Sequence, residues 1–298
     1  MKLNNVNEEP SGYGYAQTGK RMRQLNWVLV GVVFALSLSA TVHANDLETI
    51  IVGRSQEDRA RDQYRHPIET LSFFEVKPGM TVVETLPGRG WYTRILVPYV
   101  GSGGRFFGAN YSVDLFKRIF GDRWESRRQQ IENWLQTFPD QTAFLANQPP
   151  ELGAFVIGQA PAELAGQVDR VLFIRSLHHL NRFDSRLLDE AAAEAYVLLK
   201  RGGIVGVVQH RAPDSNSQEW SNGDNGYLRQ TRVIEAFEAA GFSLEATTEL
   251  NSNALDVPTE NDRVWRLPPS LRAEGEAREV SLAIGESDRM TLKFVKPK

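Results

Sequence analysis

One run constrains the fold of this chain more than any other segment: TVVETLPGRGW, from Thr81 to Trp91. Its β-branched residues lead into the carboxylate of Glu84, and a Pro-Gly-x-Gly turn through Pro87, Gly88 and Gly90 then opens a predicted helix. At the carboxyl end of a first parallel strand, such a turn lets the backbone approach a nucleotide-type ligand, because glycine has no side chain. The same turn also joins strands to helices in proteins without a ligand. The run therefore indicates a cofactor loop if the rest of the chain follows as an α/β sheet.

The rest of the chain alternates between strand-like and helix-like segments. Strands are predicted at 81–84, 105–109, 154–157, 168–174, 204–209, 242–247 and 289–295. Helices are predicted at 57–74 with a kink or break at Pro67, at 91–100, at 112–138 with a stop at Pro139, and at 184–199 and 225–240. The least regular segment, 251–285, is predicted to be an ordered flap or a mobile loop. This order predicts a mainly parallel sheet covered by helices.

The N-terminus has the parts of a secretory signal peptide. Lys20, Arg21 and Arg23 precede an apolar stretch at 25–40, and a small-residue cleavage site ends at Ala44. The apolar stretch is short against the roughly 20 residues that span a bilayer, so we expect cleavage rather than the alternative, an uncleaved membrane anchor. The prediction is an N-terminal extension and signal peptide at 1–44 and one domain at 45–298. The mature protein is then periplasmic or secreted, without a stable membrane anchor. Met22 would itself open a compact signal, so the start at Met1 or Met22 stays open.

Composition excludes several classes of function. The predicted leader carries four Lys/Arg and two Glu, so the mature chain has 30 basic and 35 acidic residues and a net charge near −5. This balance argues against a nucleic-acid partner, which needs a basic face. The chain has no cysteine, which excludes disulfides, thiolate nucleophiles and cysteine metal sites. The Gly-x-Ser-x-Gly elbow of serine hydrolases and the Gly-x-x-x-x-Gly-Lys-Ser/Thr phosphate loop are also missing.

Five motifs together resemble the class I S-adenosylmethionine-dependent methyltransferase superfamily: VVE at 82–84, PGRG at 87–90, GQA at 158–160, DRVLFI at 169–174 and LLKRGG at 198–203. More narrowly, the chain resembles a family of exported methyltransferases through the helix at 61–74, PGRGWYT at 87–93 and HRAPD at 210–214. The similarity runs from about residue 54 to Pro297. It implies a Rossmann-like α/β fold with a mainly parallel seven-stranded sheet and helices on both faces. It also implies S-adenosyl-L-methionine as cofactor and a small molecule or an envelope component as methyl acceptor.

The resemblance implies a set of cofactor-binding residues: Glu84, Pro87, Gly88, Gly90, Asn110, Gln159 and Arg175. Three positions depart from the family pattern. Leu86 stands where the first glycine is common, Asn110 where an acid usually accepts the ribose hydroxyls, and Gln159 where an acid often accepts the adenine amino group. The amides keep an acceptor but lose the charge, and neutral hydrogen bonds contribute about 0.5–1.5 kcal/mol against about 1.5–3 for charged ones. We therefore expect weakened cofactor binding or a site retuned for another ligand.

Polar residues follow the fourth and fifth predicted strands, where open α/β sheets place their ligands. His178, His179 and His210 are the candidates for a general base in methyl transfer, and the alternative is that they hydrogen-bond loop backbone. Arg211 and Asp214 also follow the fifth strand. A His-His zinc site lacks a third ligand at suitable spacing, so no metal is predicted.

Two further groups of residues have competing interpretations. Arg61, Asp62, Arg65 and Glu69 are spaced for surface ion pairs along one helix face, and alternatively Tyr64, Arg65 and His66 contact substrate. Trp91 and Tyr92 pack over the ligand or belong to the core.

Three functions remain open at this point. The first is an exported methyltransferase. The second is a non-catalytic binding protein on the same fold, with a decayed or repurposed cofactor site, which export favours because the periplasm has no obvious supply of S-adenosylmethionine. The third, a nicotinamide-dependent oxidoreductase, is weaker, because Gly88 and Gly90 are followed by Thr93 and the Gly-x-Gly-x-x-Gly spacing fails.

Overall fold

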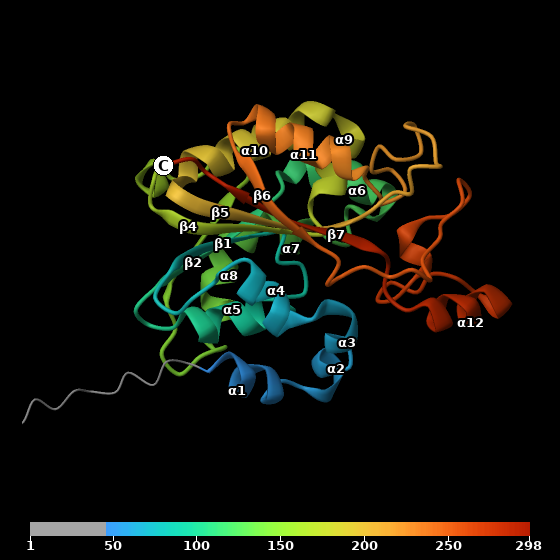
Figure 1. Ribbon diagram of the computed structural model, residues 1–298. Coiled ribbons are helices and arrows are strands. Elements are labelled where there is room, and N and C mark those ends of the chain that lie inside the picture. The colour runs from blue at the N-terminus through green and yellow to red at the C-terminus, as the bar shows by residue number, and fades with distance from the viewer. Residues whose placement is uncertain (1–45) are drawn as a thin grey trace, which may run out of the picture. The chain divides into compact units, whose positions relative to one another are not determined.

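The computed structural model describes residues 46–298 of the chain (Figure 1). The predicted signal peptide and its cleavage site lie outside these residues. Among residues 46–298, every helix is too short or too polar to span a bilayer.

The described residues form a seven-stranded sheet in the order β3-β2-β1-β4-β5-β7-β6. The strands are β1 (Thr81–Thr85), β2 (Arg105–Asn110), β3 (Glu151–Val156), β4 (Val168–Ile174), β5 (Leu199–His210), β6 (Ser243–Thr248) and β7 (Arg289–Val295). The pairs among β1 to β5 are parallel, whereas β7 runs antiparallel to both β5 and β6. The prediction of a mainly parallel seven-stranded sheet is confirmed.

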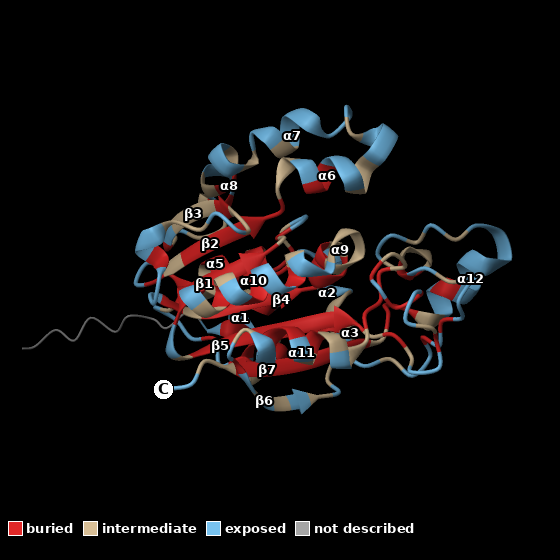
Figure 2. Cartoon of the chain, turned by 90° about the horizontal axis from the view of Figure 1, so that it is seen from above, coloured by how far each residue is buried: buried red, intermediate tan, exposed pale blue. Residues whose placement is uncertain are grey.

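Helices cover both faces of the sheet (Figure 1). One face carries α1 (Leu47–Val52), α4 (Pro67–Phe73), α5 (Thr93–Val100) and α8 (Trp134–Ala143). The other carries α6 (Val113–Phe120), α9 (Leu177–Phe183), α10 (Ser185–Leu198) and α11 (Gln230–Ala239). Figure 2 shows the inner strands β1, β4 and β5 as buried, while the edge strand β6 is open to solvent along one side. Burial of two apolar faces by two helical layers explains why this alternating sequence forms a parallel sheet.

The helical segment predicted at 57–74, with a kink or break at Pro67, is divided further than predicted. The segment forms α2 (Gln56–Arg59), α3 (Asp62–Arg65) and α4, and His66 between the last two has a φ of 40°. A residue before proline is disfavoured in the right-handed helical region, so Pro67 ends one helix and starts the next. The predicted break at Pro67 is confirmed.

The stop predicted at Pro139 is also wrong, because this proline lies inside α8. The segment 112–138 is broken earlier instead, into α6, a 3₁₀ turn η1 (Gly121–Arg123) and α7 (Arg128–Glu132) before α8. Phe138 packs against the sheet at Gly108, where an added Cβ would come within 2.5 Å of its ring. This tertiary contact holds α8 through a residue that disfavours helix locally.

The segment 251–285, which we call the covering segment, is ordered by polar anchors. It contains η3 (Val264–Arg266) and an unpredicted helix, α12 (Gly275–Ile284), which is mostly exposed (Figure 2). Asp256 accepts hydrogen bonds from the Tyr227 hydroxyl and Arg266, and the Asn253 amide donates to two backbone carbonyls near residue 285. The ordered flap is therefore the correct alternative of the two predicted.

Candidate functional site

Two adjoining cavities lie at the carboxyl ends of the parallel strands. The first has a volume of about 630 Å³, and we call it the arginine–histidine cavity after Arg61, Arg175, His178 and His210 in its wall. The second, about 750 Å³, is called the aromatic cavity after Tyr111, Phe116, Phe120 and Trp265. The walls of both include Leu86, Gly88, His179, Trp265 and Arg272. The strand order reverses between β1 and β4, and this is the crevice where open α/β sheets bind ligands.

The loop after β1 opens onto both cavities. Leu86, Gly88 and Gly90 all have positive φ angles, of 49°, 61° and 74°. The left-handed conformation costs a non-glycine residue roughly 1–2 kcal/mol. Leu86 adopts it nonetheless, and its backbone N–H donates to the Ala109 carbonyl at 2.7 Å. The turn therefore keeps the shape of a glycine loop although a leucine stands at its first position.

Glu84 lies behind this loop and not on its surface. Its side chain is buried, and its Oε2 accepts a hydrogen bond from the Thr93 hydroxyl at 2.7 Å. Burial raises the pKa of Glu84 to about 7, against the opposing effects of the Thr93 bond and of Arg175 and Arg94. Among the described residues, those that line the two cavities do not include Glu84. In this state the carboxyl group orders the loop and the start of α5.

The structure does not bring the two amides of the predicted cofactor site to either cavity wall. Asn110 is buried at the end of β2, where its Oδ1 accepts from the Tyr111 backbone N–H at 3.0 Å. Gln159 is exposed, and the N–H groups on either side of it, at Gly158 and Ala160, donate to the Glu194 carboxylate. Direct contact of Asn110 and Gln159 with a cofactor stays a prediction.

The three candidate histidines come together at the ends of β4 and β5. The ring centroids of His178 and His179 are 4.1 Å apart, and those of His178 and His210 are 5.6 Å apart. The His210 Nδ1 lies 2.5 Å from the Ser287 hydroxyl, and the His178 Nδ1 lies 3.4 Å from the Gln209 amide. All three rings reach the wall of the arginine–histidine cavity. Their predicted position at one edge of the sheet is thus observed.

Burial keeps these histidines neutral. It lowers the pKa of His178 to about 4 and holds the pKa values of His179 and His210 well below the usual value. Neighbouring histidines and arginines lower the pKa values of His179 and His210 further, whereas at His178 the hydrogen bond with Gln209 opposes the shift and Arg175 and Arg182 add to it. Neutral imidazoles can accept a hydrogen bond from a ligand, and the His179 Nδ1 is buried with no partner among the described residues.

The predicted surface ion pairs along the helix before β1 are wrong. Arg61 and Arg65 both pair with Glu286, more than 200 residues away, and the side chain of Arg65 is only 1% exposed. Asp62 pairs with Arg54. Glu286, directly after the covering segment, lies against α3 and the residue before it, and the paired charges are therefore in part buried.

Trp91 combines the two roles that the sequence left open. It is buried in the core, its Nε1 donates to the Asp58 carbonyl, and it also lines the arginine–histidine cavity. The guanidinium groups of Arg54 and Arg65 lie 4.8 and 4.6 Å from its ring centroids. Tyr92 is buried, and its hydroxyl donates to the Arg65 carbonyl at 3.3 Å. Trp91 thus lies between the arginines that precede β1, Arg54 and Arg65, and the cavity wall.

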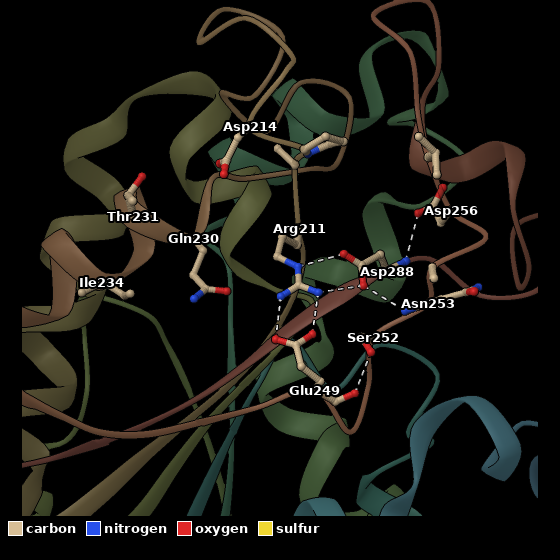
Figure 3. Close-up of a pocket in the computed structure, with 14 residues that line it drawn as sticks. Arg211, Asp214, Gln230, Thr231, Ile234, Glu249, Ser252, Asn253, Asp256 and Asp288 are labelled. Carbon is tan, nitrogen blue, oxygen red and sulfur yellow. Dashed lines mark hydrogen bonds and ion pairs between the residues drawn. The ribbon is translucent and has the colours of Figure 1, made fainter.

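Arg211 and Asp214 line a different pocket beyond the carboxyl end of β5, together with residues that follow β6 and precede β7 (Figure 3). The Arg211 guanidinium points between Glu249 and Asp288 and forms ion pairs with both carboxylates at 2.7 and 2.8 Å. Asp288 also accepts from the Asn253 backbone N–H, which belongs to the covering segment. These contacts connect the start of the covering segment to the residue that precedes β7.

Sequence reasoning missed the aromatic residues that give the aromatic cavity its name. The Trp265 ring stacks on the His179 ring, and the Tyr111 hydroxyl donates to the Ser176 carbonyl. Phe116 and Phe120 stack on each other along α6. The one available signal was a tryptophan beside two prolines in a segment without periodicity, at 265–269. Among the described residues, no cluster of three His, Asp or Glu side chains is arranged to hold a metal ion.

Known proteins resemble this chain in structure but not in sequence. No family model matches the sequence, and a search of curated proteins found no match. A chain from the complex between the Haloferax volcanii Trm112 methyltransferase activator and its putative methyltransferase is similar in structure. Its TM-score is 0.50 and its identity 17%, over 85% of this chain and 98% of that one. The [4+2]-cyclase SpnF has a TM-score of 0.50 and 16% identity, over 82% of this chain and 84% of its own. An S-adenosylmethionine-dependent methyltransferase from Aquifex aeolicus has a TM-score of 0.44 and 17% identity, over 68% and 92%.

In the strand order, β7 lies between β5 and β6 and runs antiparallel to both, and this arrangement is typical of the class I methyltransferase fold. The chain has the Rossmann-like fold of class I methyltransferases. The predicted fold class is therefore confirmed, and so is the broader resemblance to S-adenosylmethionine-dependent methyltransferases. Identities below 20% establish the fold alone, and a cyclase among the similar structures illustrates that this fold hosts other reactions.

Proposed function

We propose that this protein is an exported methyltransferase that transfers a methyl group from S-adenosylmethionine to a small molecule or an envelope component. The observation that carries the proposal is the Leu86–Gly90 loop. It has the left-handed turns of a glycine loop, lies at the strand-order reversal and opens onto both cavities. The signal-peptide pattern of the sequence supports export to the periplasm or beyond.

The residues present fit the cofactor in part. Gly88 lines both cavities, and a Cβ added there would meet only one backbone oxygen, at 3.7 Å, so its backbone faces open space that a ligand can fill. Pro87 and Arg175 line the arginine–histidine cavity with it. When bound, S-adenosylmethionine supplies the activated methyl group. The protein's part is to orient the acceptor and to exclude water from the space under the covering segment.

The histidine cluster is suited to positioning more than to strong base catalysis. A general base works best with a pKa near the operating pH, and the pKa of His178 is lowered to about 4. Neutral His178, His179 and His210 can instead accept a hydrogen bond from an acceptor hydroxyl or amine and fix its direction. Without a strong base in the site, methyl transfer favours an acceptor that is itself a good nucleophile.

Specific observations favour the second candidate, a non-catalytic binding protein. The Asn110 side-chain Oδ1 accepts from the Tyr111 backbone N–H, and Gln159 is exposed, and neither residue lines a cavity. Leu86 holds a strained conformation where glycine would be relaxed. A cofactor site that lost its ligand would accumulate changes of this kind.

Calorimetric titration of the purified protein separates the candidates. S-Adenosylmethionine, S-adenosylhomocysteine and NAD are the three ligands, and saturation at 100 times the dissociation constant also adds about 2.7 kcal/mol of stability, visible as a rise in Tm. Micromolar binding of the two sulfur ligands, lost in Glu84→Gln and kept in the exposed control Glu125→Gln, supports the methyltransferase. Binding of NAD alone would favour an oxidoreductase, and no binding would leave the binding-protein alternative. Release of S-adenosylhomocysteine in the presence of candidate acceptors then tests turnover.

A further inference from the structure

We propose that the arginine–histidine cavity is a binding site for an anionic group, a carboxylate or a phosphate, which Arg175 recognises. The proposal deepens the proposed function by naming the chemistry of its ligand. It does not depend on S-adenosylmethionine, because the geometry that supports it concerns only the cations around the cavity.

Arg175 lies at the carboxyl end of β4 and lines the cavity beside His178 and His210. Its backbone has a φ of 58°, held by a hydrogen bond from its N–H to the Val208 carbonyl at 2.6 Å. Backbone strain of this kind persists only where the surrounding structure holds it, and it is concentrated at ligand-binding and active sites. Within residues 46–298, the Arg175 guanidinium makes no hydrogen bond or ion pair, and its buried Nε has no partner. A guanidinium carries five donors that match carboxylate and phosphate oxygens, so this side chain is poised without an acceptor.

The charge around the cavity is not balanced. Arg61, Arg65 and Arg289 all pair with one carboxylate, that of Glu286, at 2.8–3.0 Å. Glu286, Arg65 and Arg289 are each at most 3% exposed at the side chain, so solvent screens this cluster poorly. Arg175 adds a fourth guanidinium close enough to the cluster to interact with Glu286, Arg61 and Arg289. Four cations with one anion leave an excess of positive charge beside an open cavity.

Other carboxylates near the cavity do not supply the missing charge. Glu57 lies in the cavity wall, but its side chain is exposed to solvent and forms no ion pair with the four arginines. Asp58 is held by Arg94 through two hydrogen bonds, at 2.6 and 2.7 Å. Glu84 has its pKa raised to about 7 by burial, so it is only partly ionised at neutral pH. Desolvation and the neighbouring arginines lower the pKa of Arg175 to about 10, the direction expected of an unpaired cation that is partly buried. Buried charges in folded proteins are normally paired, and a ligand anion completes the pairing here.

The first test uses inorganic phosphate as the probe. The Tm of the purified protein and of two variants is measured against phosphate concentration, with sodium chloride at matched ionic strength as the reference. Arg175→Gln removes the positive charge and the forked guanidinium donors and keeps a side chain that is also unbranched at Cβ. Arg128→Gln removes one positive charge from α7 at an exposed position outside the wall of the arginine–histidine cavity.

We expect a saturable rise in Tm with phosphate in the wild type and in Arg128→Gln, with at least tenfold weaker binding in Arg175→Gln. Acetate is tested as the carboxylate probe under the same conditions. A wild type that responds to neither anion beyond the chloride reference would overturn the proposal. An equal response in Arg175→Gln would overturn it too, because the anion would then bind elsewhere.

The stability of the ligand-free protein gives a second readout. If Arg175 is a recognition residue, Arg175→Gln relieves repulsion from Arg61 and Arg289, and the Tm without ligand stays level or rises. A structural arginine would lower the Tm on removal, and that result contradicts the proposal.

Adenosine ligands then identify the source of the anionic group. S-Adenosylhomocysteine carries a carboxylate, whereas 5′-methylthioadenosine does not. If Arg175→Gln abolishes the preference for S-adenosylhomocysteine, the site takes the amino-acid carboxylate of the cofactor. If that preference is unchanged while phosphate binding is lost, the anionic group belongs to the methyl acceptor. Phosphate binding without any adenosine binding keeps this proposal and rejects the methyltransferase.

Discussion

The ring of His179 lies parallel to the ring of Trp265, with centroids 5.9 Å apart and an angle of 12° between the planes. His179 belongs to α9, directly after β4, and Trp265 belongs to the covering segment, so the pair joins the sheet edge to its cover. Both residues line both cavities. The pair therefore lies where the two cavities adjoin, and a ligand that extends through both cavities would pass it.

Trp265→Ala is expected to weaken ligand binding about tenfold or more, because aromatic stacking contributes about 1–3 kcal/mol per base. The measurement is calorimetric titration with S-adenosylhomocysteine or whichever ligand binds the wild type. Trp124→Ala, at a tryptophan between η1 and α7 that lines neither cavity, is the matched control. Equal affinities of Trp265→Ala and wild type would place the ligand elsewhere.

Glu84 gives a pH dependence of stability with a definite sign. Burial raises its pKa from 4.5 to about 7 in the folded state, so the folded protein binds more protons than the unfolded chain between these values. Stability from this group is therefore present at low pH and is lost as the pH rises from 4.5 to about 7, by about 3 kcal/mol in total. Urea unfolding of wild type and Glu84→Gln at pH 5 and pH 7.5 measures the difference. A gap between the two proteins that does not change with pH would show that Glu84 is ionised throughout.

Glu286→Gln is expected to destabilise the protein by about 3–5 kcal/mol, because it leaves buried guanidinium groups without their carboxylate. Glu125→Gln removes an exposed partner of Arg128 and should change the free energy of unfolding by less than about 1 kcal/mol. Urea unfolding compares both with the wild type. Similar values for the two variants would mean that the buried cluster is solvated.

Leu86 allows the backbone cost of the loop to be isolated. Leu86→Ala and Leu86→Gly both remove the leucine side chain beyond Cβ, but only glycine relieves the φ of 49°. We expect Leu86→Gly to be more stable than Leu86→Ala by about 1 kcal/mol, the reverse of the order at ordinary positions. Thermal unfolding of both variants measures it. If the alanine variant is the more stable one, the loop changes conformation on substitution.

Much of the sheet could be predicted from the sequence because its inner strands are buried on both faces and read as short apolar runs. The bounds of β4 and β7 agree with the predicted ranges 168–174 and 289–295. The helices were predicted less well. Local signals placed a stop at Pro139, where packing of Phe138 on Gly108 keeps the helix intact, and gave no signal for the exposed α12.

The site was predictable where it follows from topology. His178, His179 and His210 meet because the carboxyl ends of adjacent parallel strands share one edge of the sheet. The partners of Arg61 and Arg65 were not predictable, because Glu286 is more than 200 residues away and no local spacing indicates it. Trp265 was missed for the same reason, since its role depends on where the covering segment folds back.

The covering segment starts after β6 and ends before β7, two antiparallel neighbours that pair from Ser243 to Thr248. Both of its ends are thus fastened to one hairpin, while its interior supplies much of the roof over both cavities. Because β6 and β7 pair with each other directly, the register of the sheet does not depend on the length or sequence of the interior of this segment. Substitutions within this one segment would change the roof of both cavities, while the paired strands beneath keep their register.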